Sequence, residues 1–168
     1  MNGYSFFAPT KVLFGAGKLG ELGAQKLPGT KALIVTTGGN SVKRFGYLGR
    51  LEAELERAGV AHELFDRIEP NPLRDTVNAG GWGARTHGCD FVLALGGGSV
   101  MDGSKGICAV ATNPHADTEG NECPGDIWDF VNGGTALGLP IPNDPLPLVC
   151  VATTAGTGSE VDAGGVLS

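Results

Sequence analysis

The chain has 168 residues and a formal net charge of −6, and its longest basic run is Lys43-Arg44. This charge pattern argues against a nucleic-acid partner. Hydrophobic residues make up 41% of the chain, but no apolar stretch reaches membrane-spanning length and "MNGYSFFAPTK" lacks a signal-peptide layout, so we expect a cytoplasmic protein without membrane contact.

Short apolar runs predict five β-strands, in chain order at residues 12–14, 32–36, 61–65, 91–95 and 148–152. Leucines at helical spacing predict a helix over Leu48–Ala58, ended by Gly59. A weaker helix is predicted over Val77–Thr86, because each of its three glycines costs helix stability. Ser99–Thr112 predicts a stronger helix, with its first residue as the N-cap and Asp102 as the capping partner.

This alternation predicts an α/β fold, with a Rossmann-like, doubly wound and mostly parallel sheet that carries helices on both faces. Residues 113–126 are predicted to be a polar loop, and Pro140–Pro147 an extended connector. The run "GGVLS" at residues 164–168 predicts the start or middle of another strand. Because a domain rarely stops inside an element that needs neighbours, we expect a single domain, residues 1–168, truncated before its end.

The cysteines and histidines do not predict a metal site. No cysteine belongs to a CxxC pair, and the apolar surroundings of three of them indicate packing residues: Cys89, Cys108 and Cys150. The polar loop contains a conceivable ligand set, although a solvated loop explains it better: His115, Asp117, Glu119 and Cys123. We therefore assign no metal ligand to this chain.

The run "VLALGGGSVMDGSKGI", Val92–Ile107, indicates an anion site. A predicted strand delivers Gly96, Gly97, Gly98 and Ser99 to the carboxyl edge of the sheet, where ligands of open parallel sheets bind. The N-terminus of the following helix has free N–H groups and a favourable dipole, which suit a phosphate. Met101 replaces the third glycine of the dinucleotide-binding fingerprint, so a tight turn without a ligand remains an alternative.

Three further strands are followed by loops of small polar residues. These loops are "TTGGNS" at 36–41, "EPNP" at 69–72 and "TTAGTGSE" at 153–160. One such loop is ordinary turn chemistry, but four at one edge indicate a long, phosphate-bearing ligand. In the last loop, the hydroxyls of Thr153, Thr154, Thr157 and Ser159 can donate to ribose and phosphate oxygens.

The stretches "GGGSVMDGSKGI", "TTAGTGSEV" and "EPNP" together resemble the iron-containing alcohol dehydrogenase family. The opening "FFAPTKVLFGAGKLGELG" is similar to the N-terminal hairpin and first helix of that family, so the resemblance covers essentially the whole chain. "TTGGNSVKRFGYL", "GDIWDFV" and "GTGSEVDAGGVLS" look like its butanol dehydrogenase and broad aldehyde reductase branch.

The resemblance implies a nicotinamide-cofactor site. The glycine run would hold the pyrophosphate, Asp102 would lie near the nicotinamide, Asn71 would lie beside a ribose, and the loop at 38–41 would read the adenosine ribose. The expected cofactor-binding residues are Gly38, Gly39, Ser41, Asn71, Gly96, Gly97, Gly98, Ser99, Asp102, Thr153, Thr154, Thr157 and Ser159. The loop at 37–41 has no acid to repel a 2′-phosphate, so we expect NADP rather than NAD, with Lys43 near enough in sequence to help.

The implied function is that of the cofactor-binding part of an NAD(P)-dependent alcohol dehydrogenase or aldehyde reductase acting on a primary alcohol or aldehyde. The family binds a divalent metal, iron or zinc, through an aspartate and three histidines in a helical C-terminal domain, which lie beyond residue 168. We therefore expect this chain alone to be inactive. An N-terminal strand at Tyr4–Phe7 would pair two copies into a homodimer. The alternatives are a glycerol dehydrogenase or dehydroquinate synthase relative, and a non-catalytic nucleotide-binding module.

Overall fold

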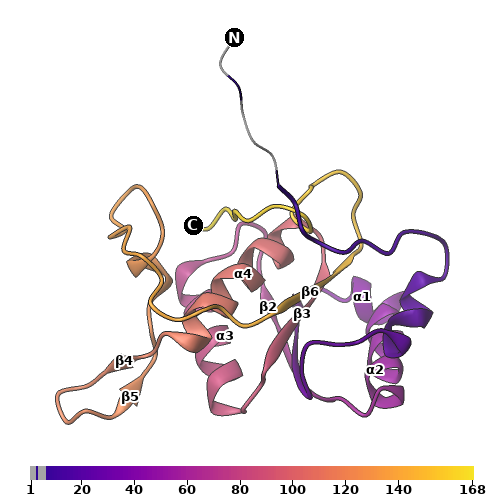
Figure 1. Cartoon of the computed structure of the whole chain (residues 1–168), viewed down its shortest axis with the longest axis horizontal. Helices are drawn as coiled ribbons and strands as arrows, with labels where there is room; N and C mark the ends of the chain where they lie inside the picture. Colours follow the sequence, from indigo (N-terminus) through magenta and orange to yellow (C-terminus); the bar gives the residue numbers. More distant parts are fainter. Residues whose placement is uncertain (1–2, 4–6) are drawn as a thin grey trace.

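The computed structural model, which describes Gly3 and residues 7–168, contains a four-stranded parallel sheet (Figure 1). Its strands are β1 (Lys31–Thr37), β2 (Ala61–Ile68), β3 (Phe91–Gly96) and β6 (Leu148–Ala152), in the order β2-β1-β3-β6. Every neighbouring pair is parallel. Four of the five predicted strands are therefore confirmed, each within a few residues of its predicted bounds.

Helices cover both faces of this sheet, as predicted. Helix α2 (Tyr47–Arg57) and the 3₁₀-helix η1 (Lys18–Ala24) lie on one face, and α3 (Arg74–Thr86) and α4 (Gly98–Thr112) lie on the other. Alternate residues of a strand point to opposite faces: Ile34 packs with the leucines of α2, and Val35 packs with α3 and α4. The buried strands can be apolar throughout because neither face meets water.

The glycines of α3 allow it to pack closely against α4. A Cβ atom added at Gly80 would lie 2.5 Å from Cδ1 of Ile107, and one added at Gly81 would lie 2.6 Å from Cβ of Val110. These glycines lower the intrinsic helix propensity, which is the reason the sequence predicted a weak helix. The helix is nevertheless complete over Arg74–Thr86, because it buries Val77 and Ala84 against its neighbours.

Two predicted strands are wrong. Residues 12–14 are irregular and exposed, with Phe14 exposed to 94%, and residues 164–168 are also irregular. The hairpin implied by the family resemblance is likewise not formed within residues 7–14. An apolar run becomes a strand only when a neighbouring strand binds its backbone, and the structure gives these two runs no such neighbour among the described residues. The predicted strand at 4–7 lies outside the described residues, except for the exposed Phe7.

The segment predicted to be a polar loop, 113–126, contains a short antiparallel hairpin that projects from the body (Figure 1). Its strands are β4 (His115–Ala116) and β5 (Glu122–Cys123). Two short helices complete the fold, α1 (Ser41–Arg44) after β1 and the 3₁₀-helix η2 (Ile127–Asp129) after the hairpin. The described residues include no helix long and apolar enough to cross a membrane.

Candidate cofactor site

The four polar loops lie at one edge of the sheet, as expected. Because β1, β2, β3 and β6 all run in the same direction, their carboxyl ends meet at this edge. Each end continues into one of the loops: residues 38–41, 69–72, 97–99 and 153–159. We call residues 96–99 the glycine turn and residues 153–159 the threonine loop.

The glycine turn leads directly into α4 without a side-chain cap. Gly97 is the N-cap residue, with an extended backbone (φ −93°, ψ −165°), and no side chain accepts from the first N–H groups of the helix. The predicted cap at Ser99 is therefore wrong, because the helix begins one residue earlier and Ser99 lies inside its first turn. The first turn carries no acidic residue. This helix end therefore offers free N–H donors and a favourable dipole to an anion.

The threonine loop packs directly on the glycine turn. The N–H of Thr153 donates to the carbonyl of Gly96 at 2.9 Å. A Cβ atom at Gly97 would lie 3.0 Å from Oγ1 of Thr154, and one at Gly98 would lie 3.3 Å from Cβ of Thr157. A side chain at either glycine would therefore crowd the threonine loop, and this close packing brings two of the predicted motifs into contact.

The other residues of these loops differ in their exposure. Thr153, Thr154 and Thr157 are exposed, so their hydroxyls are accessible to a ligand. Ser159 is buried behind Gly98, with 7% exposure, and is the least accessible of the predicted donors. Gly96 has a packing role, because a Cβ there would lie 2.5 Å from Cγ2 of Val100.

Asp102 does not cap its own helix, in contrast to the prediction. Its Oδ2 accepts from the N–H of Val166 at 3.1 Å, and its Oδ1 lies 3.7 Å from Nζ of Lys105. The Asp102 carboxylate therefore faces residues 162–166, which follow the threonine loop. Lys105 also points to this segment, where it contacts Asp162.

An acid that the local sequence did not reveal lies beside the loop after β1. Lys43 Nζ lies 2.7 Å from Oδ2 of Asp66, which comes from β2, and a Cβ at Gly38 would lie 3.2 Å from the Asp66 carbonyl. The Lys43 ammonium lowers the pKa of the Asp66 carboxyl below its usual value. The feature that could have predicted this contact is the parallel pairing of β1 with β2. That pairing sets Thr37, at the end of β1, opposite Ile68, two residues beyond Asp66. Ser41 is exposed at the start of α1, and a Cβ at Gly39 would meet only Oγ1 of Thr37 at an ordinary 3.5 Å.

Asn71 occupies a left-handed turn between β2 and α3. Its φ of 56° is the only positive value at a non-glycine residue within the described chain, and asparagine adopts this conformation more readily than most residues. The adjacent Pro72 lies against α4, because a Cβ at Gly103 would be 3.3 Å from Cβ of Pro72. Glu69 accepts from Oγ1 of Thr76 at 2.8 Å. The Asn71 turn is thus held beside the helix that the glycine turn begins.

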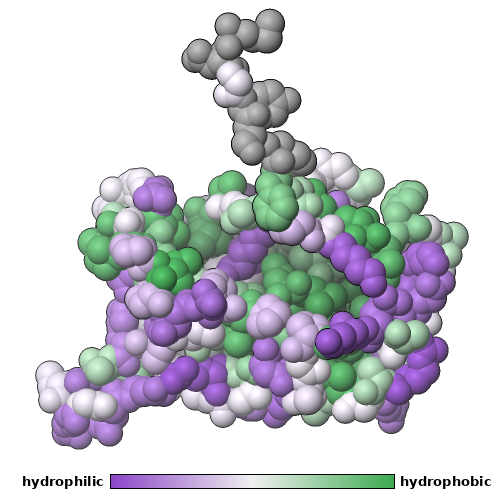
Figure 2. All heavy atoms as spheres, in the orientation of Figure 1, coloured by the Kyte–Doolittle hydropathy of each residue, from purple (hydrophilic) through white to green (hydrophobic). Residues whose placement is uncertain are grey.

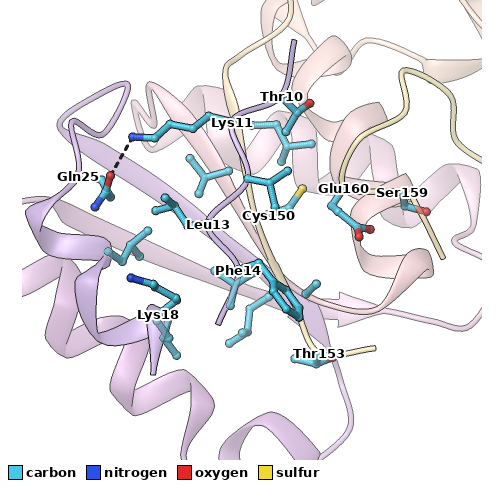
Figure 3. Close-up of a pocket in the computed structure, with 18 of the residues that line it drawn as sticks. Thr10, Lys11, Leu13, Phe14, Lys18, Gln25, Cys150, Thr153, Ser159 and Glu160 are labelled. Atoms are coloured by element: carbon cyan, nitrogen blue, oxygen red, sulfur yellow. Dashed lines mark hydrogen bonds between the residues drawn. The ribbon is translucent and has the colours of Figure 1, made fainter. Parts of the chain in front are cut away.

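A cavity of about 1560 Å³ lies beside the predicted site (Figures 2 and 3). It separates β6 from the irregular segment 9–17 and the adjoining η1, and it was not foreseen from the sequence. Thr153, Thr154 and Ser159 line it, whereas Asn71, Asp102 and the other predicted cofactor residues do not. Figure 2 shows that its floor is mainly hydrophobic.

Cys108 and Cys150 also line this cavity, as packing residues. Burial raises the pKa of the Cys150 thiol to about 11 and raises that of Cys108 as well. Both thiols are therefore protonated near neutral pH, consistent with the predicted packing role.

The histidines and acids of the chain are dispersed. Among Gly3 and residues 7–168, no three His, Cys, Asp or Glu side chains converge to hold a metal ion. His115 Nε2 instead pairs with Oδ2 of Asp129 at 2.6 Å, and Asp117 accepts from the N–H groups of Glu119 and Asn121 in its own turn. The residues present do not provide a site for the metal of the family.

Comparison with known proteins identifies the family of this chain. The family model described as "iron-containing alcohol dehydrogenase" matches residues 9–168. The chain belongs to this family.

The most similar proteins include enzymes that use either nicotinamide cofactor. A probable NADH-dependent butanol dehydrogenase of Bacillus subtilis is 37% identical over 100% of this chain and 40% of its own length. The NADPH-dependent aldehyde reductase YqhD of Escherichia coli is 36% identical over the same shares. The crystal structure of an archaeal alcohol dehydrogenase from a Red Sea brine pool superposes with a TM-score of 0.85 at 36% identity, over 99% of this chain and 40% of that one. The chain thus spans about 40% of the length of these relatives.

Proposed function

We propose that this chain is the cofactor-binding part of an NAD(P)-dependent alcohol dehydrogenase or aldehyde reductase. The observation that carries the proposal is the contact between the uncapped glycine turn and the exposed hydroxyls of the threonine loop, at the carboxyl edge of a parallel sheet. Backbone N–H groups and hydroxyls in this arrangement suit a pyrophosphate bridge. Family membership and the relatives' nicotinamide cofactors support the same assignment.

In this proposal, each loop has its own task. The N–H groups at the start of α4 bind the pyrophosphate, and the hydroxyls of Thr153, Thr154 and Thr157 donate to ribose and phosphate oxygens. Asn71 lies beside a ribose, and residues 38–41 contact the adenosine ribose. When bound, the cofactor supplies the chemistry of hydride transfer, while the protein supplies binding and orientation.

A calorimetric titration of the 168-residue chain with NADP+ tests this proposal. Thr154→Val removes one exposed hydroxyl but keeps the shape of the side chain, so the dissociation constant should rise about three- to tenfold, the value of one hydrogen bond. Thr118→Val, at another exposed threonine in the turn of the projecting hairpin, should leave it unchanged. Absence of dinucleotide binding by the wild-type chain, or equal effects of the two substitutions, would contradict the proposal.

We further propose that the cofactor is NADP. The loop at 37–41 contains no acid, and the Asp66 carboxylate beside it is neutralised by Lys43. This loop therefore presents little net negative charge to a 2′-phosphate.

The substrate class that we propose for the whole protein is a primary alcohol or an aldehyde. The names of the relatives, a butanol dehydrogenase and an aldehyde reductase, support this choice. Such a reaction needs a Lewis acid on the substrate oxygen, and the described residues contain no ligand set for one. We therefore propose that iron or zinc is held by residues outside this chain and that the chain alone is inactive. Turnover of butanol with NADP+ and added iron or zinc, lost on chelation, would contradict this.

We also propose a cytoplasmic homodimer. All four cysteines lie within the described residues and none is paired, which suits a reducing compartment. The exposed apolar side chains of Phe7, Val12 and Phe14 support association through the N-terminal segment. Light scattering of the purified chain measures the oligomeric state, and a monomer at micromolar concentration would contradict the dimer.

A further inference from the structure

The segment that follows β6 starts beside the end of β3 and ends beside the loop that follows β2, and backbone hydrogen bonds fasten it at both ends. At its start, Thr153 N–H donates to the carbonyl of Gly96 at 2.9 Å. At its far end, Ser168 N–H donates to the Pro72 carbonyl, and Arg74 N–H donates to the Ser168 carbonyl, each at 2.9 Å. Residues 153–168, all of them described, form no helix or strand in between. Ordering such a chain costs conformational entropy, so its middle needs another anchor.

Helix α4 provides this anchor through Lys105 and Asp102. Lys105 Nζ donates to the carboxylate of Asp162 and to the carbonyl of Gly164, and it lies 3.7 Å from Oδ1 of Asp102. One turn earlier on the helix, Asp102 accepts from the N–H of Val166 at 3.1 Å. The backbone of Gly165 approaches Asp102 so closely that an added Cβ would lie 3.3 Å from its Cα.

The charges explain why the lysine is central to this contact. An ammonium group has three N–H donors, and Lys105 faces three acceptors. Its side chain and that of Asp102 are only 18% and 15% exposed, so the interaction is partly shielded from water. Without Lys105, two carboxylates would face each other without a cation, and the Gly164 carbonyl would lose its partner. The same contacts occupy the ammonium, which is therefore not free to bind a phosphate.

We propose that Lys105 is a positioning residue for cofactor binding. By holding residues 162–164 on α4, it shortens the free part of the segment to the threonine loop itself. It thereby keeps Thr154 and Thr157 against Gly97 and Gly98. This inference rests on the proposed cofactor-binding function, but the anchoring itself can be measured without any cofactor.

The first experiment measures hydrogen exchange of residues 160–168 in the 168-residue chain. In Lys105→Met, exchange of these amides should become faster on the order of tenfold, because charged hydrogen bonds are lost. Exchange in β3 and the second half of α4 should stay as in the wild type. Lys105→Arg should restore part of the protection. The control is Lys31→Met, which removes a lysine with a single carboxylate partner, Glu63, at the opposite edge of the sheet.

Asp162→Ala is a second variant in case Lys105→Met fails to fold. This substitution removes one acceptor of the Lys105 ammonium, the Asp162 carboxylate, whose side chain is 55% exposed. It should accelerate exchange in residues 160–168 in the same direction as Lys105→Met. Unchanged exchange in both variants would overturn the anchoring role of Lys105.

The second experiment measures NADP+ binding to the same variants by calorimetry. We expect the dissociation constant to rise on the order of tenfold in Lys105→Met, to recover in part in Lys105→Arg, and to stay unchanged in Lys31→Met. Faster exchange with unchanged affinity would overturn the positioning role. If Lys105→Met shows faster exchange but the wild-type chain binds no dinucleotide, the proposed function is overturned and the anchoring role of Lys105 still stands.

Discussion

Two glycines on one helix should respond in opposite directions to the same substitution. Gly81 of α3 faces α4, where an added Cβ would lie 2.6 Å from both Cβ and Cγ1 of Val110. Gly83, two residues later, has no atom within 4 Å of its added Cβ. Gly→Ala within a helix favours folding by up to about 1 kcal/mol, whereas overpacking costs about 1–3 kcal/mol. Gly83→Ala should therefore raise the free energy of unfolding by up to about 1 kcal/mol, and Gly81→Ala should lower it by up to about 2 kcal/mol.

The difference between the two variants isolates the helix–helix contact, because the change in helix propensity is nearly the same in both. Urea denaturation followed by circular dichroism measures both values, and a difference of about 1–3 kcal/mol is expected. Val110→Ala should cost less in the Gly81→Ala background than in the wild type, because the smaller side chain makes room for the added methyl group. Equal stabilisation by Gly81→Ala and Gly83→Ala would refute the close packing of α3 on α4.

Three further predictions concern charge and the cofactor site. The Arg74 guanidinium, whose Nε lies 2.8 Å from Oδ1 of Asp126, holds the pKa of that carboxyl well below its usual range, so Asp126→Asn should lower the free energy of unfolding by about 2 kcal/mol at pH 7. A carboxyl with a depressed folded-state pKa contributes this stability above its unfolded pKa near 4 and loses it as the pH falls further. Denaturation curves should therefore show the difference in stability between variant and wild type shrinking below about pH 4, and a pH-independent difference would contradict the ion pair. Gly98→Val should weaken NADP+ binding by displacing the threonine loop, and unchanged affinity by calorimetry would count against the phosphate site. Gly39→Asp, which has room for a side chain, should weaken binding of NADP+ relative to NAD+ by charge repulsion, with Gly39→Asn as the uncharged control; a preference for NAD+ before any substitution would defeat the NADP assignment.

The sequence alone determined the layered architecture and the edge of the sheet where the candidate site lies. Apolar runs such as Phe91–Leu95 and leucines at helical spacing in α2 report which residues must be buried, and burial sets local structure wherever the run finds partners. Glycine and threonine motifs that follow parallel strands must meet at one edge, so their contact was also predictable.

The tertiary structure decided which residues contact one another across elements. Residues 12–14 have the pattern of a strand, but a strand needs a neighbour, and that requirement is not local. The partner of Lys43 proved to be Asp66 from the adjacent strand, and the partners of Lys105 proved to be Asp162 and Gly164, 57 and 59 residues away in sequence. A charged side chain does not encode its partner in its own surroundings in the sequence, because the pairing depends on the distance between elements after they pack.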